Sequence, residues 1–299
     1  MRILVNGVTY RVQVAGEGPP LLLLHGFTGS GDTWAPLLPA LAAQYRTVAP
    51  DLLGHGETDA PTDPGRYRME RCVEDLLGLL DALGIRRSHV LGYSMGGRVA
   101  LHLALAAPER VRSLVLVGAS PGIADAAERA ARIKQDEELA AFIEREGVAA
   151  FVQRWEQLPL FATQQRLPES VRAAIRAQRL RQRPEGLANS LRGMGAGAQE
   201  PLVERLGQVS MPCLLMAGEL DEKYRRLVGE MAARMPRAET AIVAGAGHAV
   251  HVEQPQAFVE QVLAFLHRHN GPEHGPAPAP LPAAAGFQGD SQKDSQEER

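Results

Sequence analysis

The first half of the chain alternates short apolar runs with longer stretches in which apolar residues recur at helical spacing. Apolar runs bounded by polar residues or glycine are typical of strands buried on both faces of a parallel sheet. Such runs occupy residues 12–14, 20–24, 46–50, 89–92 and 111–117. Between them we expect helices at 32–43, 69–83 and 95–106, the first capped by Asp32 and the second ended by Gly84. This alternation predicts a mostly parallel sheet with helices on both faces.

The alternation stops in the middle of the chain and then resumes. Residues 124–203 are rich in Ala, Glu, Gln and Arg and contain no strand-like run. Strands and helices are expected again at 211–216, 223–235, 240–243 and 256–268. A helical insert between two α/β halves predicts a cap over the carboxyl edge of the sheet, where open α/β sheets bind ligands. The expected parts are a core segment (1–123), a helical cap (124–203), a second core segment (204–270) and a disordered tail (271–299).

Composition and charge narrow the class of protein. With 45% hydrophobic and 22% charged residues, the chain is ordinary for a globular enzyme. A formal net charge of -3 argues against nucleic acid as a partner. Cys72 and Cys213, the 2 cysteines, are expected to be small buried hydrophobes. No apolar stretch suits a signal peptide or a membrane span, so we expect a cytoplasmic protein without membrane contact, as a monomer or small homo-oligomer.

One pentapeptide carries the strongest chemical signal. Gly92-Tyr93-Ser94-Met95-Gly96 matches the G-x-S-x-G pattern and lies between a predicted strand and a predicted helix. In that turn the serine takes a strained backbone conformation that lifts its hydroxyl above the sheet, so the residues two positions away must be small. The following helix directs its N-terminus towards any anion that forms there. The motif predicts Ser94 as a nucleophile or base.

A serine hydroxyl becomes reactive when a histidine accepts its proton and an acid orients that histidine. The expected chain order in this kind of fold is Ser, then Asp or Glu, then His. Asp221 follows one late strand, and His248 ends a glycine-rich loop after the next strand. Both are therefore predicted partners of Ser94. Glu219 on the same loop is the alternative acid, and Asp221 is preferred.

The remaining histidines and the glycine-rich turn suggest no bound cofactor. His251 is expected to line or support the site, whereas His55, His89 and His102 are expected to be structural. These histidines form no metal-ligand cluster in the sequence, and the chain has no dinucleotide fingerprint. We therefore predict neither a metal nor a cofactor.

The loop His25-Gly26-Phe27 follows a predicted buried strand and suits an oxyanion hole. Its expected donors are the backbone N–H groups of Phe27 and Met95, the second being the residue after the serine. Together, the elbow, the triad order and this loop resemble the α/β-hydrolase fold. Many chemistries share that fold, so it does not by itself give the activity.

Three further segments resemble one family within this fold, the 2-succinyl-6-hydroxy-2,4-cyclohexadiene-1-carboxylate synthases of menaquinone biosynthesis. The segments are residues 92–98, 155–161 and 186–195, in a resemblance that runs from about residue 21 to residue 266. Members of the family are lyases. The resemblance implies that pyruvate is eliminated from 2-succinyl-5-enolpyruvyl-6-hydroxy-3-cyclohexene-1-carboxylate to give 2-succinyl-6-hydroxy-2,4-cyclohexadiene-1-carboxylate. It also implies that Ser94, activated by His248 and Asp221, is a general base that forms no acyl-enzyme.

The same resemblance implies which residues bind the substrate. They are Tyr93, Arg98, Arg132, Trp155 and Arg179. Arg192 is the alternative to Arg179, because the alignment across the cap leaves both open.

The composition of the cap points independently to a small polycarboxylate substrate. The cap of this mildly acidic chain carries Arg129, Arg132, Arg172, Arg176, Arg179, Arg181, Arg183 and Arg192. A guanidinium group binds carboxylates bidentately. The alternative is that most of these arginines form a solvated helix face, since four of them recur at helical spacing, and Trp155 is equally compatible with core packing.

Two other classes of function remain open. A hydrolase that cleaves esters or C–C bonds through an acyl-serine would use the same triad, although it gains nothing from an arginine-rich cap. A binding module without catalysis is disfavoured because Ser94, Asp221 and His248 are all present.

Overall fold

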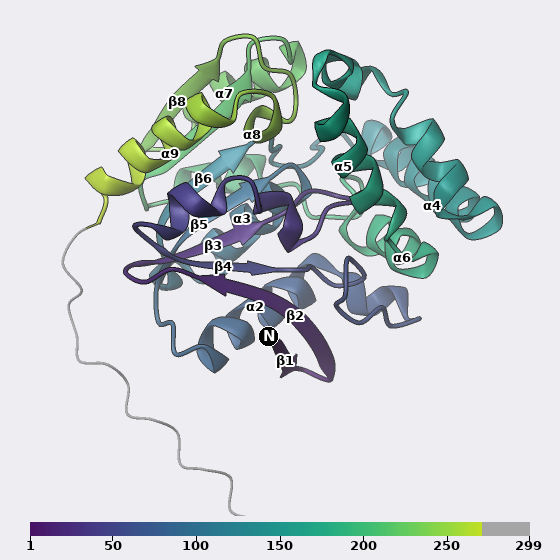
Figure 1. Cartoon of the computed structure of the whole chain (residues 1–299), viewed down its shortest axis with the longest axis horizontal. Coiled ribbons are helices and arrows are strands. Elements are labelled where there is room, and N and C mark those ends of the chain that lie inside the picture. The colour runs from purple at the N-terminus through teal and green to yellow at the C-terminus, as the bar shows by residue number, and fades with distance from the viewer. Residues whose placement is uncertain (271–299) are drawn as a thin grey trace, which may run out of the picture.

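The computed structural model describes residues 1–270. A single sheet runs through the centre of the molecule (Figure 1). Within these residues its order is β1-β2-β4-β3-β5-β6-β7-β8. The strands are β1 (Arg2–Val5), β2 (Val8–Ala15), β3 (Pro20–Leu24), β4 (Arg46–Pro50), β5 (Ser88–Tyr93), β6 (Val111–Val117), β7 (Cys213–Gly218) and β8 (Ala238–Val243). The predicted disordered tail, 271–299, lies outside the described residues.

The pairing confirms a mostly parallel sheet. Only β1 with β2 and β2 with β4 pair antiparallel, and every other neighbouring pair in residues 1–270 is parallel. Strand β1 was not expected. Asn6 and Gly7, which both have positive φ (47° and 77°), form its hairpin turn with β2. An Asn-Gly pair is a strong signal for such a hairpin, so the sequence contained the information.

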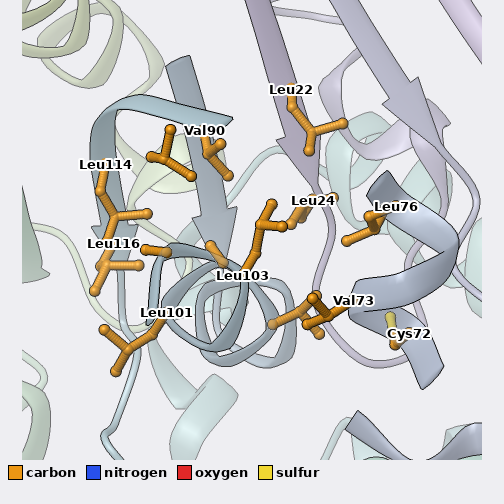
Figure 2. Close-up of a cluster of buried hydrophobic side chains, with 14 of the residues drawn as sticks. Leu22, Leu24, Cys72, Val73, Leu76, Val90, Leu101, Leu103, Leu114 and Leu116 are labelled. Carbon is orange, nitrogen blue, oxygen red and sulfur yellow. The ribbon is translucent and has the colours of Figure 1, made fainter. Parts of the chain in front are cut away.

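Helices cover both faces of the sheet, as predicted. They are α1 (Leu38–Ala42), α2 (Met69–Ala82), α3 (Met95–Ala106), α4 (Ala126–Trp155), α5 (Glu169–Leu180), α6 (Pro184–Met194), α7 (Glu222–Ala232), α8 (Val250–Glu253) and α9 (Pro255–Arg268). Side chains of β3 alternate between the faces. Leu22 and Leu24 pack with α2 and α3 (Figure 2), whereas Leu21 and Leu23 pack with α1 and α9. Burial on both faces explains why this strand is continuously apolar.

The predicted helix at 32–43 is wrong in its extent and in its cap. The chain instead forms a 3-10 turn, η1 (Gly31–Trp34), and then the short α1. Pro36 and Pro39 lack the N–H groups that a continuous helix would use. The capping side chain is that of Ser30, which accepts from the Asp32 N–H, while Asp32 itself pairs with Arg11.

The segment between β6 and β7 consists of α4, η4 (Pro159–Arg166), α5 and α6, without a strand. These helices gather on one side of the sheet in Figure 1. They have a hydrophobic cluster of their own, which includes Ile143, Phe151 and Leu187. Helix α4 is bent at Gly147, whose φ of 79° and ψ of 171° are not helical. A segment with its own core supports the cap, and its limits at 124 and 203 stay predictions.

Both cysteines are buried and free, as expected. In residues 1–270 no helix combines the length and the apolar character that a membrane crossing requires.

Candidate active site

Ser94 stands at the sharp turn between β5 and α3. Its φ of 51° and ψ of -110° are unusual for a residue with a side chain. The turn needs glycine on both sides, because a Cβ at Gly92 would lie 2.3 Å from the Gly96 carbonyl oxygen and one at Gly96 would lie 2.2 Å from that of Leu24. The Ser94 N–H donates to the Val117 carbonyl of the neighbouring strand at 2.8 Å. The strained conformation is thus held by close packing of the backbone.

His248 and Asp221 come from the ends of β8 and β7, and both lie beside Ser94. His248 Nε2 is 3.1 Å from Ser94 Oγ, and His248 Nδ1 is 2.8 Å from Asp221 Oδ2. Asp221 is also the N-cap of α7, where its other oxygen accepts the Tyr224 N–H. Both side chains are buried. The three groups therefore form one hydrogen-bonded chain with the carboxylate at its inner end.

Glu219, the alternative acid, has a different partner. Its carboxylate accepts the Gly245 N–H at 2.9 Å and makes no contact with His248. A second acid was not expected: Glu253 accepts the N–H groups of Gly247 at 2.7 Å and Ala249 at 3.2 Å, on either side of His248. These two glutamates thus support the loop that carries the histidine.

Phe27 and Met95 border the same space as Ser94. Met95 is in the first turn of α3, where no intrahelical acceptor exists. The Phe27 N–H has no acceptor among residues 1–270. Buried His25 fixes the loop before Phe27, because its Nδ1 contacts the Gly26 carbonyl at 2.8 Å and its Nε2 accepts the Leu52 N–H at 2.9 Å. Burial lowers the pKa of His25 to about 4, so the imidazole is neutral at pH 7.

A cavity of about 210 Å³ lies between this hydrogen-bonded chain and the cap. Ser94, His248, Phe27 and Met95 all line it, and Asp221 lies behind His248. The substrate-binding residues that the resemblance implied also line it: Tyr93, Arg98, Arg132, Trp155 and Arg179. Arg192, the alternative to Arg179, does not. Its guanidinium pairs with Glu137 and Glu144 on α4.

Arg98 is the most unusual cation in the cavity. Its guanidinium donates to the Met194 carbonyl at 2.7 Å and to the Gln199 amide oxygen at 2.5 Å, and it pairs with no carboxylate in residues 1–270. Burial lowers the pKa of Arg98 to about 10, so it remains charged at pH 7. A buried guanidinium without an internal counter-ion is suited to bind an anion.

The two other predicted arginines of the cavity are already paired. Arg132 Nε is 2.8 Å from Asp136 Oδ1, and Arg179 Nη1 is 3.3 Å from Glu156 Oε1. The Arg179 guanidinium also lies 4.9 Å from the centre of the Phe161 ring. Their carboxylate partners orient both arginines and partly neutralise them.

Trp155 serves packing and the cavity together. Its ring centre lies 5.4 Å from those of Phe27 and Phe151, so it belongs to the contact between core and cap. Its indole N–H has no partner within residues 1–270 although it is shielded from solvent. Core packing and contact with a ligand are therefore not alternatives for this residue.

Several residues of the cavity were missed in the sequence. They include Ser120, Phe161, Gln164, Lys223 and Tyr224. Tyr224 lies three residues after Asp221, and its ring centre is 4.6 Å from that of His248. No motif or spacing in the sequence predicts this contact. His251 lines the cavity, as expected. Within residues 1–270 no group of His, Cys, Asp and Glu is arranged to hold a metal.

The chain was then compared with known proteins. Residues 19–255 match the family model described as alpha/beta hydrolase fold. A Bacillus subtilis (strain 168) protein, provisionally assigned as 2-succinyl-6-hydroxy-2,4-cyclohexadiene-1-carboxylate synthase, is 46% identical over 87% of this chain and 96% of its own length. The synthase of that name from Serratia proteamaculans (strain 568) is 30% identical over 85% of this chain and 95% of its own.

Solved structures agree with these relatives. The structure of MenH from S. aureus superposes with a TM-score of 0.84 and 33% identity, over 88% of this chain and 99% of that one. In each of these three comparisons the match covers at least 95% of the other protein. The chain therefore belongs to the alpha/beta hydrolase fold family and, within it, to the 2-succinyl-6-hydroxy-2,4-cyclohexadiene-1-carboxylate synthases.

Proposed function

We propose that this chain is a lyase that eliminates pyruvate from 2-succinyl-5-enolpyruvyl-6-hydroxy-3-cyclohexene-1-carboxylate to give 2-succinyl-6-hydroxy-2,4-cyclohexadiene-1-carboxylate. The observation that carries the proposal is the combination of two features in one cavity. Ser94 and His248 line the cavity, and so do the cations Arg98, Arg132, Arg179 and Lys223. The substrate carries several carboxylates, and these cations supply groups to bind them.

The proposed base is Ser94 acting through His248. His248 accepts the serine proton at Nε2, and the Asp221 carboxylate favours the tautomer with hydrogen on Nδ1 by accepting a hydrogen bond from it. The serine oxygen then removes the ring proton next to the succinyl ketone. General-base catalysis of this kind contributes about 10²–10⁴ in rate.

The path of the electrons from the broken C–H bond follows from the positions of the double bonds in the substrate ring and in the product ring. They form a new ring double bond, the existing double bond shifts by one position, and the C–O bond to the enolpyruvyl group breaks. Pyruvate leaves as its enolate and takes up a proton. Negative charge that develops on the ketone oxygen is stabilised by the N–H groups of Phe27 and Met95, each worth about 10²–10³ in rate.

A hydrolase that cleaves esters or C–C bonds through an acyl-serine is the alternative, because it needs the same triad. The arginines of the cavity favour the lyase, since a neutral ester would leave the buried Arg98 charge without a partner. For the same reason we propose a small polycarboxylate as the only partner that the site requires. Cytoplasmic location and a monomer or small homo-oligomer stay predictions.

The test is pyruvate release from the enolpyruvyl-bearing substrate, measured for the wild-type protein and for Ser94→Ala, beside hydrolysis of a short-chain p-nitrophenyl ester. We expect rapid pyruvate release that Ser94→Ala abolishes, with little ester cleavage. Brisk serine-dependent ester cleavage without pyruvate release would instead establish the hydrolase.

A further inference from the structure

His251 occupies a place on the cavity wall that the proposed reaction does not use. It lies on α8, three residues after His248, and is only 3% exposed. Its ring centre lies 4.4 Å from that of Tyr93 and 5.2 Å from that of Trp34. The imidazole is therefore held between a residue of the cavity and a residue of the core.

The two nitrogens of His251 have different surroundings. Nδ1 is shielded from solvent and has no hydrogen-bond partner in residues 1–270. Nε2 has no protein partner there either, but it is not shielded, and the side chain lines the cavity. Burial and the nearby His248 lower the pKa of His251 to about 3, so the ring is neutral at pH 7. A neutral imidazole has one donor and one acceptor nitrogen. The tautomer therefore decides whether Nε2, the nitrogen at the cavity, donates or accepts a hydrogen bond.

The indole N–H of Trp34 is the group that can fix the tautomer of His251. Its side chain is fully buried, and its indole nitrogen also lacks a partner in the described part of the chain. An indole N–H can only donate, and a buried donor without an acceptor costs about 1–3 kcal/mol. The ring of His251, whose centre lies 5.2 Å from that of Trp34, has an unpartnered nitrogen of its own, Nδ1, that can accept a hydrogen bond.

We propose that His251 is a neutral hydrogen-bond donor for the substrate: Nδ1 accepts from the Trp34 indole, and Nε2–H donates to a substrate carboxylate oxygen. The identity of the substrate rests on the proposed function. Arg179 acts on Tyr93 from the cavity, where its charge opposes the rise in the pKa of Tyr93 that burial causes. His251, Tyr93 and Arg179 all line the same cavity, so a carboxylate bound there has a cation and a neutral donor available.

A neutral donor has a physical advantage at this position. A second cation next to His248 would oppose protonation of His248 and so weaken it as a base. His251 provides a hydrogen bond to an anionic oxygen without adding charge. In this arrangement Trp34 is a positioning residue, because it acts through the tautomer of His251 and does not line the cavity.

The tautomer is measured directly by ¹⁵N NMR of the imidazole groups in the full-length protein, with the His251 signals identified by their loss in His251→Phe. We expect the Nε2–H form in the wild type between pH 6 and pH 8 (roughly one unit either side of neutral), and a shift towards the Nδ1–H form in Trp34→Phe. A wild-type protein in the Nδ1–H form overturns the proposal. An unchanged tautomer in Trp34→Phe overturns the role of Trp34.

Two substitutions separate hydrogen bonding from packing. His251→Phe keeps a ring between Trp34 and Tyr93 and removes both nitrogens, whereas His251→Gln removes the ring and keeps an amide donor near the place of Nε2. We expect KM for pyruvate release to rise about 10-fold to 100-fold in His251→Phe, the effect of losing a hydrogen bond to a charged group. His251→Gln should show a smaller rise.

The reverse order, with His251→Phe unaffected and His251→Gln impaired, would assign His251 to packing alone. This outcome is distinct from failure of the proposed function. If the wild-type protein releases no pyruvate, the proposed function fails, and the NMR result still decides the tautomer.

Discussion

Glu253 supports the loop that carries His248, the proposed partner of Ser94. Its two carboxylate oxygens hold the backbone on both sides of His248, and it does not line the cavity. In Glu253→Gln one oxygen is replaced by an NH₂ group that faces an N–H. We expect kcat to fall about 10-fold to 100-fold, the effect of a small displacement of a catalytic group, while KM changes little.

Glu260→Gln is the matched control for this substitution, because Glu260 is an exposed residue of α9. Steady-state kinetics give kcat and KM for both variants, and urea unfolding gives their free energies of unfolding. If Glu253→Gln lowers only the free energy of unfolding and leaves kcat intact, the loop does not depend on this carboxylate for its catalytic geometry.

Arg98 and Arg192 form a second matched pair at the residue scale. Arg98 has no carboxylate partner and lines the cavity, whereas Arg192 pairs with Glu137 and Glu144 outside it. We expect Arg98→Met to lower kcat/KM about 10-fold to 100-fold, because a hydrogen bond to a charged group is lost. Arg192→Gln should leave kcat/KM nearly unchanged. Similar losses in both variants would show that cap stability, and not substrate binding, explains the effect.

Sequence patterns located the site residues unevenly. Ser94, Asp221 and His248 are each tied to a strand end, and parallel strands bring their carboxyl ends to one edge, so the chain order was enough to group them. Phe161 and Tyr224 carry no such signal, because they reach the cavity from helical segments whose packing angle the sequence does not give. The orphaned polar groups of Trp155 and Trp34 are visible only in three dimensions.

At the scale of elements, the bend in α4 divides the cap and positions Trp155 beyond it. Gly147 has φ 79° and ψ 171°, a region essentially restricted to glycine, and a Cβ there would meet no atom within 4 Å. Gly147→Ala therefore changes the backbone preference without introducing a steric clash. We expect a loss of about 1–3 kcal/mol in stability, together with a lower kcat/KM, because residues after the bend shift.

Gly229→Ala is the control for Gly147→Ala. Gly229 is a helical residue of α7, and a Cβ there also meets nothing within 4 Å. Alanine should stabilise that helix by up to about 1 kcal/mol. Thermal unfolding and limited proteolysis of both variants distinguish the two directions. If Gly147→Ala is as stable as the wild type, the bend is not needed for the cap.

Element prediction succeeded where packing and periodicity agree. The buried strands and the helices α2, α3 and α9 were found with shifts of a few residues, because each has a clear apolar face or run. The helix at 32–43 was wrong, because Pro36 and Pro39 break its hydrogen-bonding. The bend at Gly147 was missed, because a single glycine within a helical pattern does not reveal its dihedral angles.

At the scale of the whole molecule, folding places several histidines in apolar surroundings as neutral groups. Burial lowers the pKa of His25, His89 and His102 to about 4 and that of His55 and His251 to about 3. In the unfolded chain the same groups have an ordinary pKa near 6.5. The unfolded state therefore binds more protons below that value, and the free energy of unfolding falls as the pH falls.

The contribution of these histidines to the free energy of unfolding is fully present above pH 6.5, and it is lost as the pH drops from 6.5 towards 4. Each such histidine contributes about 1.4 kcal/mol per pH unit to this slope, so five reach up to about 7 kcal/mol per pH unit. Since a domain is stable by about 5–15 kcal/mol, we expect unfolding within about two pH units below 6.5. Urea unfolding at stepped pH measures the slope. His102→Gln should reduce it by the share of one histidine. A slope that His102→Gln leaves unchanged would mean that His102 is protonated equally in the folded and unfolded states.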